Sequence, residues 1–391
     1  MQEAVIVDAV RTPFGDRNGA FRDTHPQDLA AEPLHALEQR VGFDPVDIED
    51  VVYGCVSPVG EQGLNIGRIA PMVAGWGDGV PGVQLNRMCG SGQQAVNFAA
   101  GQIRAGYHDV LVAGGVEHMT LVPMGSSGNA EEGVVDENAV TDTYLEYYDE
   151  ITSQGEGAER IAEEYGFSRE EVDRLAVDSQ RRWKTAWDEG RYDSQLWPVE
   201  TTLDGDKITV EKDGHPRPDS TTESLGKLPL AFREEGDGVH HAGNSSGIVD
   251  GASALLVTSA EAAEEHGWEP MARVRQTEVV GVDPITMLTG PIPATEQVLE
   301  KAELTVDDVD LFEVNEAFAS VVLAWLTETG ADWDRTNVNG GAIAHGHPLG
   351  ATGAALLTKL VHALEERDED VGLSTMCIGF GQGIATIVER L

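Results

Sequence analysis

An internal repeat with an offset of 261 residues constrains the fold of this 391-residue chain more than any other feature of its sequence. Residues 43–56 (FDPVDIEDVVYGCV) align with residues 304–317 (LTVDDVDLFEVNEA), and residues 92–115 align with residues 353–376 at the same offset. One offset shared by two separate blocks indicates a duplicated structural unit. We therefore predict two halves of similar structure.

Each half shows the same order of predicted elements: a helix, a strand, a glycine-rich loop, a second helix and a buried strand. The second helices carry apolar residues at i, i+4 and i+8, a spacing that gives a helix one apolar face. These residues are Ala95, Ala99 and Ile103 in the first half and Leu356, Leu360 and Leu364 in the second. Strands that alternate with helices favour parallel or mixed sheets covered by helices. The predicted class is α/β, with a duplicated, layered core.

The segment between the halves has a different texture. It contains an acidic stretch at 125–142, two predicted helices at 157–166 and 168–190, and a turn-rich segment at 213–220. A long insertion on a scaffold commonly forms a binding or lid element. We expect residues 1–116 with 241–268 to form the first half, residues 117–240 the inserted loop domain, and residues 269–391 the second half.

Charge limits the partners of this chain. Its 68 acidic and 26 basic residues give a formal net charge of −42, which would repel the phosphates of nucleic acids. The acidic residues are spread along the chain, so a solvated acidic surface is predicted. Such a surface repels itself unless salt screens it, and screening lengths fall to about 3 Å at 1 M salt. We therefore expect a halophilic protein from an extreme halophile, and a haloarchaeon as its source.

The compartment and the metal content follow from the remaining composition. The three cysteines are too few for a disulfide framework and include no C-x-x-C pair for zinc. His345 and His347 lie in a glycine-rich stretch without a neighbouring carboxylate, so no metal site is expected. No apolar run approaches a membrane span, and the N-terminus has the pattern of a first strand rather than a signal peptide. A soluble, cytoplasmic protein is expected.

Cys89 is the strongest candidate nucleophile. It lies in QLNRMCGSGQQAV, between a short apolar strand and an apolar-faced helix. A sulfur near a helix N-terminus is favoured as thiolate, and the glycines at Gly90 and Gly92 allow a carbonyl group to approach the backbone. The Cys89 amide can donate to an oxyanion. An inert buried cysteine is the alternative.

His347 is a candidate base. It lies in NGGAIAHGHPLGATG and aligns, through the repeat, with Asn86, three residues before Cys89. Equivalent loops of a duplicated fold face each other across the pseudo-twofold axis, so the two side chains can be neighbours. His345 competes for this role, and Pro348, which fixes the local backbone, favours His347.

Two further segments carry candidate groups. Cys377 begins CIGFGQG at the end of the last buried strand and can act as an acid or base, or be a core cysteine. Asn315 and Glu316, in NEAF, follow the strand equivalent to residues 51–54 and point at the same crevice. Alternatively, Asn315 caps the next helix.

These segments together resemble the active-site signatures of the thiolase family. NRMCGSG, NEAFA, GGAIAHGHPLGATG and CIGFGQG occur in the family's order and spacing, and the similarity covers essentially the whole chain. The resemblance implies a thiolase fold, in which two repeated halves form a five-layered αβαβα core with an inserted loop domain that binds coenzyme A. It also implies reversible, CoA-dependent Claisen condensation and thiolysis of acetyl-CoA and 3-ketoacyl-CoA.

The resemblance further implies roles for individual residues. Cys89 would carry the acyl group, His347 would activate it, and Cys377 would move the proton on the α-carbon of acetyl-CoA. Asn315 would hold a water that forms one oxyanion hole with His347, and the amides of Cys89 and Gly379 would form the other.

Substrate contacts are implied in the same way. Ser246 resembles the pantetheine contact of the family and Arg217 its nucleotide-phosphate contact. Coenzyme A would act as substrate, with no tightly bound cofactor. We expect a homodimer or tetramer, with a small accessory subunit as a further expected partner. One departure is that Gln154-Gly155-Glu156 stands where many acetoacetyl-CoA thiolases have a Met-Gly pair.

Two other functions were weighed against this one. A decarboxylating ketoacyl synthase of the same superfold uses a second histidine where this chain has Asn315, and Cys377 would have no role in it. A non-catalytic acyl-CoA or lipid-binding relative should lack one of the four catalytic groups, and this chain has all four. The sequence therefore favours a thiolase.

Overall fold

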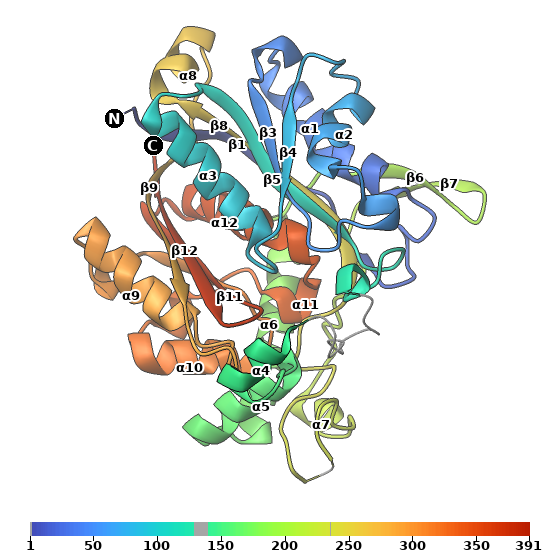
Figure 1. The fold of residues 1–391 in the computed structure, drawn as a ribbon, viewed down its shortest axis with the longest axis vertical. Helices are drawn as coiled ribbons and strands as arrows, with labels where there is room; N and C mark the ends of the chain where they lie inside the picture. Colours follow the sequence, from blue (N-terminus) through green and yellow to red (C-terminus); the bar gives the residue numbers. More distant parts are fainter. Residues whose placement is uncertain (1, 129–139, 235) are drawn as a thin grey trace.

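The structure is a computed structural model that describes residues 2–128, 140–234 and 236–391 (Figure 1). Residues 129–139 of the predicted acidic stretch lie outside the described residues. The strands are β1 (Ala4–Arg11), β2 (Gly15–Asp16), β3 (Asp50–Gly54), β4 (Gly82–Leu85), β5 (Val110–His118), β6 (Val199–Leu203), β7 (Asp206–Val210), β8 (Val249–Ser259), β9 (Ala272–Gly281), β10 (Leu311–Val314), β11 (Val371–Ile378) and β12 (Gln382–Arg390).

The helices alternate with these strands in the two halves and follow one another between them. They are α1 (Pro26–Val41), α2 (Ile66–Val73), α3 (Ser91–Ala105), α4 (Asp142–Tyr148), α5 (Gln154–Tyr165), α6 (Arg169–Asp188), α7 (Thr222–Leu225), α8 (Ala260–His266), α9 (Pro291–Ala302), α10 (Ala319–Thr329), α11 (Ala342–His345) and α12 (Leu349–Arg367). The helices predicted at 157–166 and 168–190 correspond to α5 and α6.

Ten strands of the described residues form one mixed sheet, with β2 pairing to β8 beside the main order β10-β11-β12-β9-β1-β8-β5-β3-β4. The first four strands of this order are equivalent to four strands of the first half: β10 to β3, β11 to β5, β12 to β8 and β9 to β1. The two sets run in opposite directions along the order, and they have the same parallel and antiparallel pairings. β10 begins 261 residues after β3, and β11 begins 261 residues after β5. The predicted duplication is confirmed.

The two halves of the sheet meet through a short antiparallel pairing between β1 and β9, at Val5 with Arg273 and Ile6 with Ala272. The sequence indicated two similar halves and did not predict this junction. It makes a single continuous sheet out of the two repeated units.

Five layers follow from where the apolar side chains pack. One apolar cluster joins α1, α2 and α8 to the outer face of the first half-sheet, and another joins α9 and α10 to the outer face of the second. A third cluster surrounds α3 and α12, which lie between the half-sheets (Figure 1). α12 is buried along nearly its whole length because it is covered from both sides. The αβαβα core expected from the resemblance is therefore present.

The helices α3 and α12 cross at glycines that occupy equivalent positions in the repeat. A Cβ atom built on Gly92 would lie 2.8 Å from the backbone nitrogen of Ala354, and one built on Gly353 would lie 2.3 Å from the nitrogen of Gln93. Only residues without a side chain permit this approach of two backbones. The crossing brings together the N-termini of both helices and the loops that precede them.

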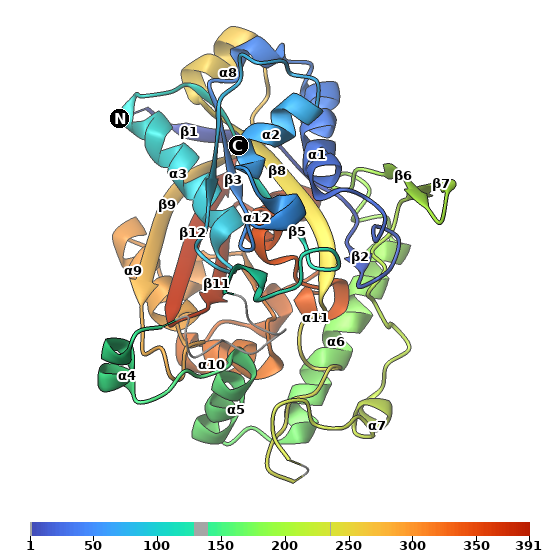
Figure 2. The ribbon, with the colours of Figure 1, turned by 45° about the vertical axis from the view of Figure 1, so that its right-hand side comes forward.

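The segment between β5 and β8 packs against the second half. α5 and α6 contact α10, and α6 also contacts α11, as Figure 2 shows below the sheet. α6 begins with a capping box, in which Ser168 accepts from the backbone of Glu171 and the Glu171 side chain accepts from the backbone of Ser168. This segment thus borders the loops at the N-termini of α3 and α12. Within the described ranges, no helix is both long and apolar enough to cross a bilayer.

Candidate active site

Cys89 lies in the tight turn between β4 and α3, as the sequence predicted. The preceding residue, Met88, has a φ of +47°, a left-handed conformation that is uncommon for a residue with a side chain. Two side chains hold the turn: Asn86 Oδ1 accepts from the Met88 amide at 2.8 Å, and Ser91 Oγ accepts from the Arg87 amide at 2.9 Å. The turn therefore fixes Cys89 just before the start of α3.

Cys89 is buried, with 2 % of its surface exposed, and its sulfur faces three N–H donors. The side-chain amide of Gln154 donates to Sγ across 3.8 Å, and the backbone N–H groups of Gly379 and Cys89 itself also point at the sulfur. Burial raises the pKa of the Cys89 thiol, and these donors only partly oppose that effect. The expectation that the helix N-terminus favours the thiolate is outweighed by burial, so the sulfur needs a base.

His347 is held in one tautomer by its neighbours. Its Nδ1 lies 2.6 Å from Oγ1 of Thr352, and that hydroxyl donates its hydrogen to the carbonyl oxygen of Pro348 at 2.9 Å. Because the Thr352 hydroxyl has no second hydrogen, it must accept from Nδ1–H. Nε2 then carries the lone pair that can accept a proton. Burial lowers the pKa of His347 to about 3, so the ring is neutral in the resting protein.

Asn315 completes this part of the site. It follows β10, and its Nδ2 lies 3.4 Å from Nε2 of His347. Its buried Oδ1 has no hydrogen-bonding partner in the described part of the protein. The alternative role, capping the next helix, does not hold because α10 begins at Ala319 with Phe318 at the cap position.

The neighbouring Glu316 has a structural role instead. Its buried carboxylate accepts hydrogen bonds from Ser179, Asn337 and the amide of Ile343, at 2.6 to 3.1 Å. It therefore ties α6 and the loop before α11 to the end of β10. Of the two polar residues in NEAF, only Asn315 contacts His347.

The competing histidine, His345, belongs to a different network. Its Nδ1 lies 2.8 Å from the carbonyl oxygen of Gly346, and its Nε2 lies 3.3 Å from Nζ of Lys359. Lys359 in turn pairs with the buried carboxylate of Glu313 at 2.9 Å. Burial and the Lys359 charge hold the pKa of His345 far below its ordinary value. Both nitrogens of His345 are thus occupied.

Cys377 lies near the end of β11, one residue before Ile378. It is 1 % exposed and packs with apolar side chains such as Met287 and Phe318. Burial, with a further contribution from the nearby Cys89, raises the pKa of its thiol. Cys377 is therefore protonated in the resting protein and lies close enough to Cys89 for the two groups to interact electrostatically.

The expected substrate contacts lie along one edge of these groups. The amide of Ser246 donates to the carbonyl oxygen of Ala317 at 2.9 Å, and the next residue, Gly247, accepts from the amide of His347 at 2.9 Å. A Cβ on Gly247 would meet the ring of His215 at 2.3 Å. Ser246 thus lies next to the loops that carry Asn315 and His347.

Arg217 lies at the protein surface, and its guanidinium already has hydrogen-bonding partners within the chain. Its guanidinium is exposed and pairs with Asp16 at 2.8 Å, while it also donates to carbonyl oxygens of residues 214–216. It is anchored by its own amide, which donates to Gln180 Oε1 at 2.7 Å. A phosphate at this position would have to share the guanidinium with Asp16.

Sequence reasoning missed a buried carboxylate that joins the two halves at this site. Glu117, at the end of β5, accepts from the amides of Val56, Ser57 and Gly350 at 2.8 to 3.1 Å, and from Gln62 at 3.0 Å. Gly350 aligns with Cys89 through the repeat. Glu117 therefore holds the start of α12 against the loop after β3. A buried glutamate at the end of an apolar strand was the only signal in the sequence.

Two other contributors were also missed as site residues. Thr352 contacts the ring of His347, and Gln154 contacts the sulfur of Cys89. The Thr352 contact follows from spacing at the start of α12, five residues after His347. The Gln154 contact depends on the docking of α5, which no local pattern predicts.

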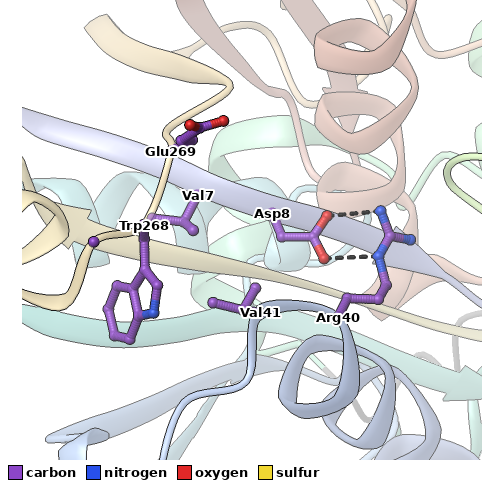
Figure 3. Close-up of a pocket in the computed structure, with 7 residues that line it drawn as sticks. Val7, Asp8, Arg40, Val41, Trp268 and Glu269 are labelled. Atoms are coloured by element: carbon purple, nitrogen blue, oxygen red, sulfur yellow. Dashed lines mark hydrogen bonds and ion pairs between the residues drawn. The ribbon is translucent and has the colours of Figure 1, made fainter.

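A pocket of about 310 Å³ lies apart from these residues, next to the centre of the sheet (Figure 3). Its lining includes Val7, Val41 and Trp268, with Asp8 paired to Arg40 through two contacts of 2.8 Å. Burial raises the pKa of Asp8 to about 6 although Arg40 opposes the shift.

Nowhere in the described ranges is a group of three His, Cys, Asp or Glu side chains arranged to hold a metal ion.

Comparison with known families identifies the family of this chain. Residues 4–261 match the family "Thiolase, N-terminal domain", and residues 268–390 match "Thiolase, C-terminal domain". This chain belongs to the thiolase family. Thiolases are acyltransferases, and this thiolase is therefore an enzyme of that class.

The similarity between this thiolase and its relatives covers its full length. It is 43 % identical to the steroid 3-ketoacyl-CoA thiolase FadA6 of Mycobacterium tuberculosis over 100 % of this chain and 95 % of that protein. It is 41 % identical to a 3-ketoacyl-CoA thiolase of Idiomarina loihiensis, with 100 % of both chains covered. It is also similar to the crystal structure of the Bacillus anthracis acetyl-CoA acetyltransferase, with a TM-score of 0.91, 37 % identity, and 100 % and 99 % of the two chains covered.

Proposed function

We propose that this thiolase catalyses the reversible, CoA-dependent condensation and thiolysis of acetyl-CoA and 3-ketoacyl-CoA through an acyl group on Cys89. The observation that carries the proposal is the set of contacts around two loops. A buried, neutral His347 has its unprotonated Nε2 beside Asn315, and the sulfur of Cys89 faces the amides of Gly379 and Cys89. Names of relatives as 3-ketoacyl-CoA thiolase support the substrate class.

The first half-reaction loads the acyl group. His347 Nε2 takes the thiol proton of Cys89, and the thiolate attacks the thioester carbonyl carbon of an acyl-CoA. The carbonyl oxygen gains negative charge and accepts from the amides of Cys89 and Gly379, a type of interaction worth roughly 3 kcal/mol per donor. The tetrahedral intermediate collapses, the CoA sulfur leaves with the proton held by His347, and the acyl group stays on Cys89.

The second half-reaction forms the carbon–carbon bond. His347 Nε2 takes the thiol proton of Cys377, and the resulting thiolate removes a proton from the α-carbon of acetyl-CoA. The enolate oxygen is stabilised by the protonated His347 and a water held by Asn315. The α-carbon attacks the acyl carbon, and Cys89 leaves as the 3-ketoacyl-CoA forms and takes the proton held by His347. In thiolysis Cys377 returns the proton to carbon. The raised pKa of Cys377 suits this acid role, and the unpartnered Oδ1 of Asn315 suits a water-holding role.

Coenzyme A enters this scheme as substrate, with no tightly bound cofactor. Ser246 is proposed to contact the pantetheine arm, because it borders the loops of Asn315 and His347. Arg217 is proposed to contact a nucleotide phosphate, because its guanidinium is exposed. Binding of that phosphate would compete with Asp16 for the same guanidinium.

A homodimer or tetramer is proposed on the basis of one edge of the sheet. β4 is the last strand of the sheet order, and apolar side chains are exposed on it and on the adjoining segment: Leu64, Met72, Val73 and Val83 are 88 %, 50 %, 39 % and 45 % exposed. An apolar patch beside an open sheet edge is typical of a subunit contact. The small accessory subunit stays a prediction.

The proposed setting is the cytoplasm of a halophile. The net charge of −42 on this thiolase is the support, since screening by molar salt removes most of the mutual repulsion. A halophilic, cytoplasmic enzyme of fatty acid metabolism is the resulting proposal.

The function is tested by assaying thiolysis of acetoacetyl-CoA and of longer 3-ketoacyl-CoAs with free CoA in molar KCl. Loss of the 3-ketoacyl-CoA enolate absorbance, together with formation of acetyl-CoA, is the expected result. Condensation that requires malonyl-CoA and releases carbon dioxide would instead identify a decarboxylating synthase. Absence of turnover with every substrate, at full CoA binding, would identify a binding protein.

A further inference from the structure

Gln154 faces the nucleophilic sulfur from an element that belongs to neither repeated half. It is the first residue of α5, directly after Ser153, whose side chain accepts from the amide of Glu156 and caps the helix. Its Nε2 donates to Sγ of Cys89 across 3.8 Å. A Cβ atom built on Gly379 would lie 3.2 Å from the same nitrogen. The Gln154 amide therefore lies on the Gly379 side of the sulfur.

The start of α5 is held firmly in this place. A Cβ atom on Gly155 would overlap the ring of Phe232 at 2.1 Å, and that ring packs edge-on against Phe318 with centroids 5.7 Å apart. Such contacts leave no room for the first turn of α5 to rotate. The backbone of Gln154 is thus fixed relative to the NEAF loop.

Polar contacts hold the next turn of α5 as well. Glu156 pairs with Arg233 at 2.8 Å, and the carboxylate of Glu159 accepts from the amides of Val239 and His240 at 2.8 and 2.9 Å. Both contacts join α5 to the segment that leads into β8. These contacts fix the backbone from which the Gln154 side chain reaches the sulfur.

The chemistry of acyl transfer gives this donor a distinct task. Before attack the negative charge lies on the sulfur, and the donors that face it are the backbone amides of Cys89 and Gly379 and the side chain of Gln154. On attack the charge moves to the thioester oxygen, which the two backbone amides serve, so Gln154 is the donor of this set that serves the sulfur alone. We propose that the side-chain amide of Gln154 donates to Sγ of Cys89 and stabilises the thiolate that His347 generates. This inference rests on the proposed function, in which Cys89 is the nucleophile.

The Gln154 hydrogen bond also affects the pKa of Cys89 in the direction that the geometry implies. Burial raises the pKa of the Cys89 thiol, and the Gln154 hydrogen bond is the first of the contributions that lower it. A neutral amide supplies this donation without adding a net charge to the site. Removing the amide should therefore make the sulfur harder to ionise.

The test measures ionisation of Cys89 directly. Wild type, Gln154→Leu, Gln154→Glu and Gln154→Asn are alkylated with iodoacetamide across a pH series in molar KCl, and the modified Cys89 peptide is quantified by mass spectrometry. Glu164→Gln, on the exposed end of the same helix, is the control. The midpoint pH of alkylation should rise in the Leu variant, rise further in the Glu variant and stay unchanged in the control.

Turnover gives a second readout. A hydrogen bond to a charged group contributes enough for a roughly tenfold to hundredfold fall in kcat/KM for thiolysis in the Leu variant. The Asn variant keeps the amide but shortens its reach, so it should also raise the midpoint. If Gln154→Leu fails to fold, the alkylation midpoint of the Asn variant alone tests whether the Gln154 amide stabilises the thiolate.

Two results would overturn the inference, and they differ from failure of the proposed function. An unchanged alkylation midpoint in a folded Leu or Asn variant, with Cys89→Ser inactive, would show that Gln154 does not stabilise the Cys89 thiolate. A Cys89→Ser variant that retains turnover would remove the proposed function itself, whatever the midpoint.

Discussion

Nδ1 of His347 lies 2.6 Å from Oγ1 of Thr352, and this contact determines which nitrogen of the imidazole can accept a proton. The hydroxyl of Thr352 already donates to Pro348, so it acts only as an acceptor toward the ring. The start of α12 therefore holds the proposed base in the tautomer that acyl transfer needs. The same helix N-terminus is pinned to the first half of the protein by Glu117.

Thr352→Val should lower kcat/KM for thiolysis by roughly tenfold to a hundredfold, because a buried N–H without an acceptor costs about 1–3 kcal/mol and the ring loses its fixed tautomer. Thr352→Ser keeps the hydroxyl and should stay close to wild type. Steady-state kinetics of the two variants checks this. Full activity in the Val variant would show that the hydroxyl does not orient His347.

Cys377→Ala should separate two steps of the reaction. Transfer of an acyl group from CoA to Cys89 does not use Cys377, so it should persist, whereas exchange of the acetyl-CoA α-proton with deuterium in the solvent should collapse. Cys55→Ala, which removes another buried thiol, directly after β3 and in the apolar cluster of the outer face, is the control and should retain the exchange. Undiminished exchange in Cys377→Ala would exclude the acid/base role.

Asp8 gives a prediction on stability that is independent of the active site. Its folded pKa of about 6 lies above the ordinary value of about 3.9, so the folded protein binds this proton more tightly than the unfolded chain. The resulting stabilisation is present at low pH and is lost as the pH rises through about 6.

Asp8→Asn removes this dependence. Its free energy of unfolding, relative to wild type, should rise by about 1–2 kcal/mol between about pH 5 and about pH 7.5. Denaturant unfolding in molar KCl measures the difference, with the exposed Glu264→Gln as control. A difference that is constant over this pH range would show that the Asp8 proton is not bound more tightly in the fold.

Salt should change stability and activity together. The 68 acidic and 26 basic side chains confine more negative charge in the folded protein than in the expanded chain, and coenzyme A is itself an anion. At 1 M salt the screening length is about 3 Å, which removes most of both repulsions. Melting temperature and turnover should both rise from dilute buffer to molar KCl. An enzyme equally stable and active in dilute buffer would contradict the proposed halophilic setting.

Most of the fold could be predicted because the repeat and the apolar periodicities are local signals. The offset of 261 residues recurs in the strand starts at Asp50 and Leu311, and the helices predicted at 157–166 and 168–190 lie where α5 and α6 are found. The pairing of β1 with β9 could not be predicted, because it joins residues about as far apart as Val5 and Arg273.

The candidate site was predictable to the extent that its residues lie in motifs. The structure brings Asn315 to His347 and brings the amide of Gly379 to Cys89, and the roles of these groups remain those proposed above. It also shows that burial, rather than the helix N-terminus, dominates the pKa of Cys89. Gln154 reaches the sulfur only through the packing of α5, and such a contact depends on tertiary structure rather than on sequence pattern.

The central claim is that Cys89 carries the acyl group, and rapid quenching after mixing with acetyl-CoA tests it most directly. The quenched protein is digested and its cysteine peptides are analysed by mass spectrometry, with Cys89→Ser treated in parallel. The account predicts an acetyl group on the Cys89 peptide of the wild type and none on any peptide of Cys89→Ser. Acetyl found on Cys377, with the Cys89 peptide unmodified, would contradict it.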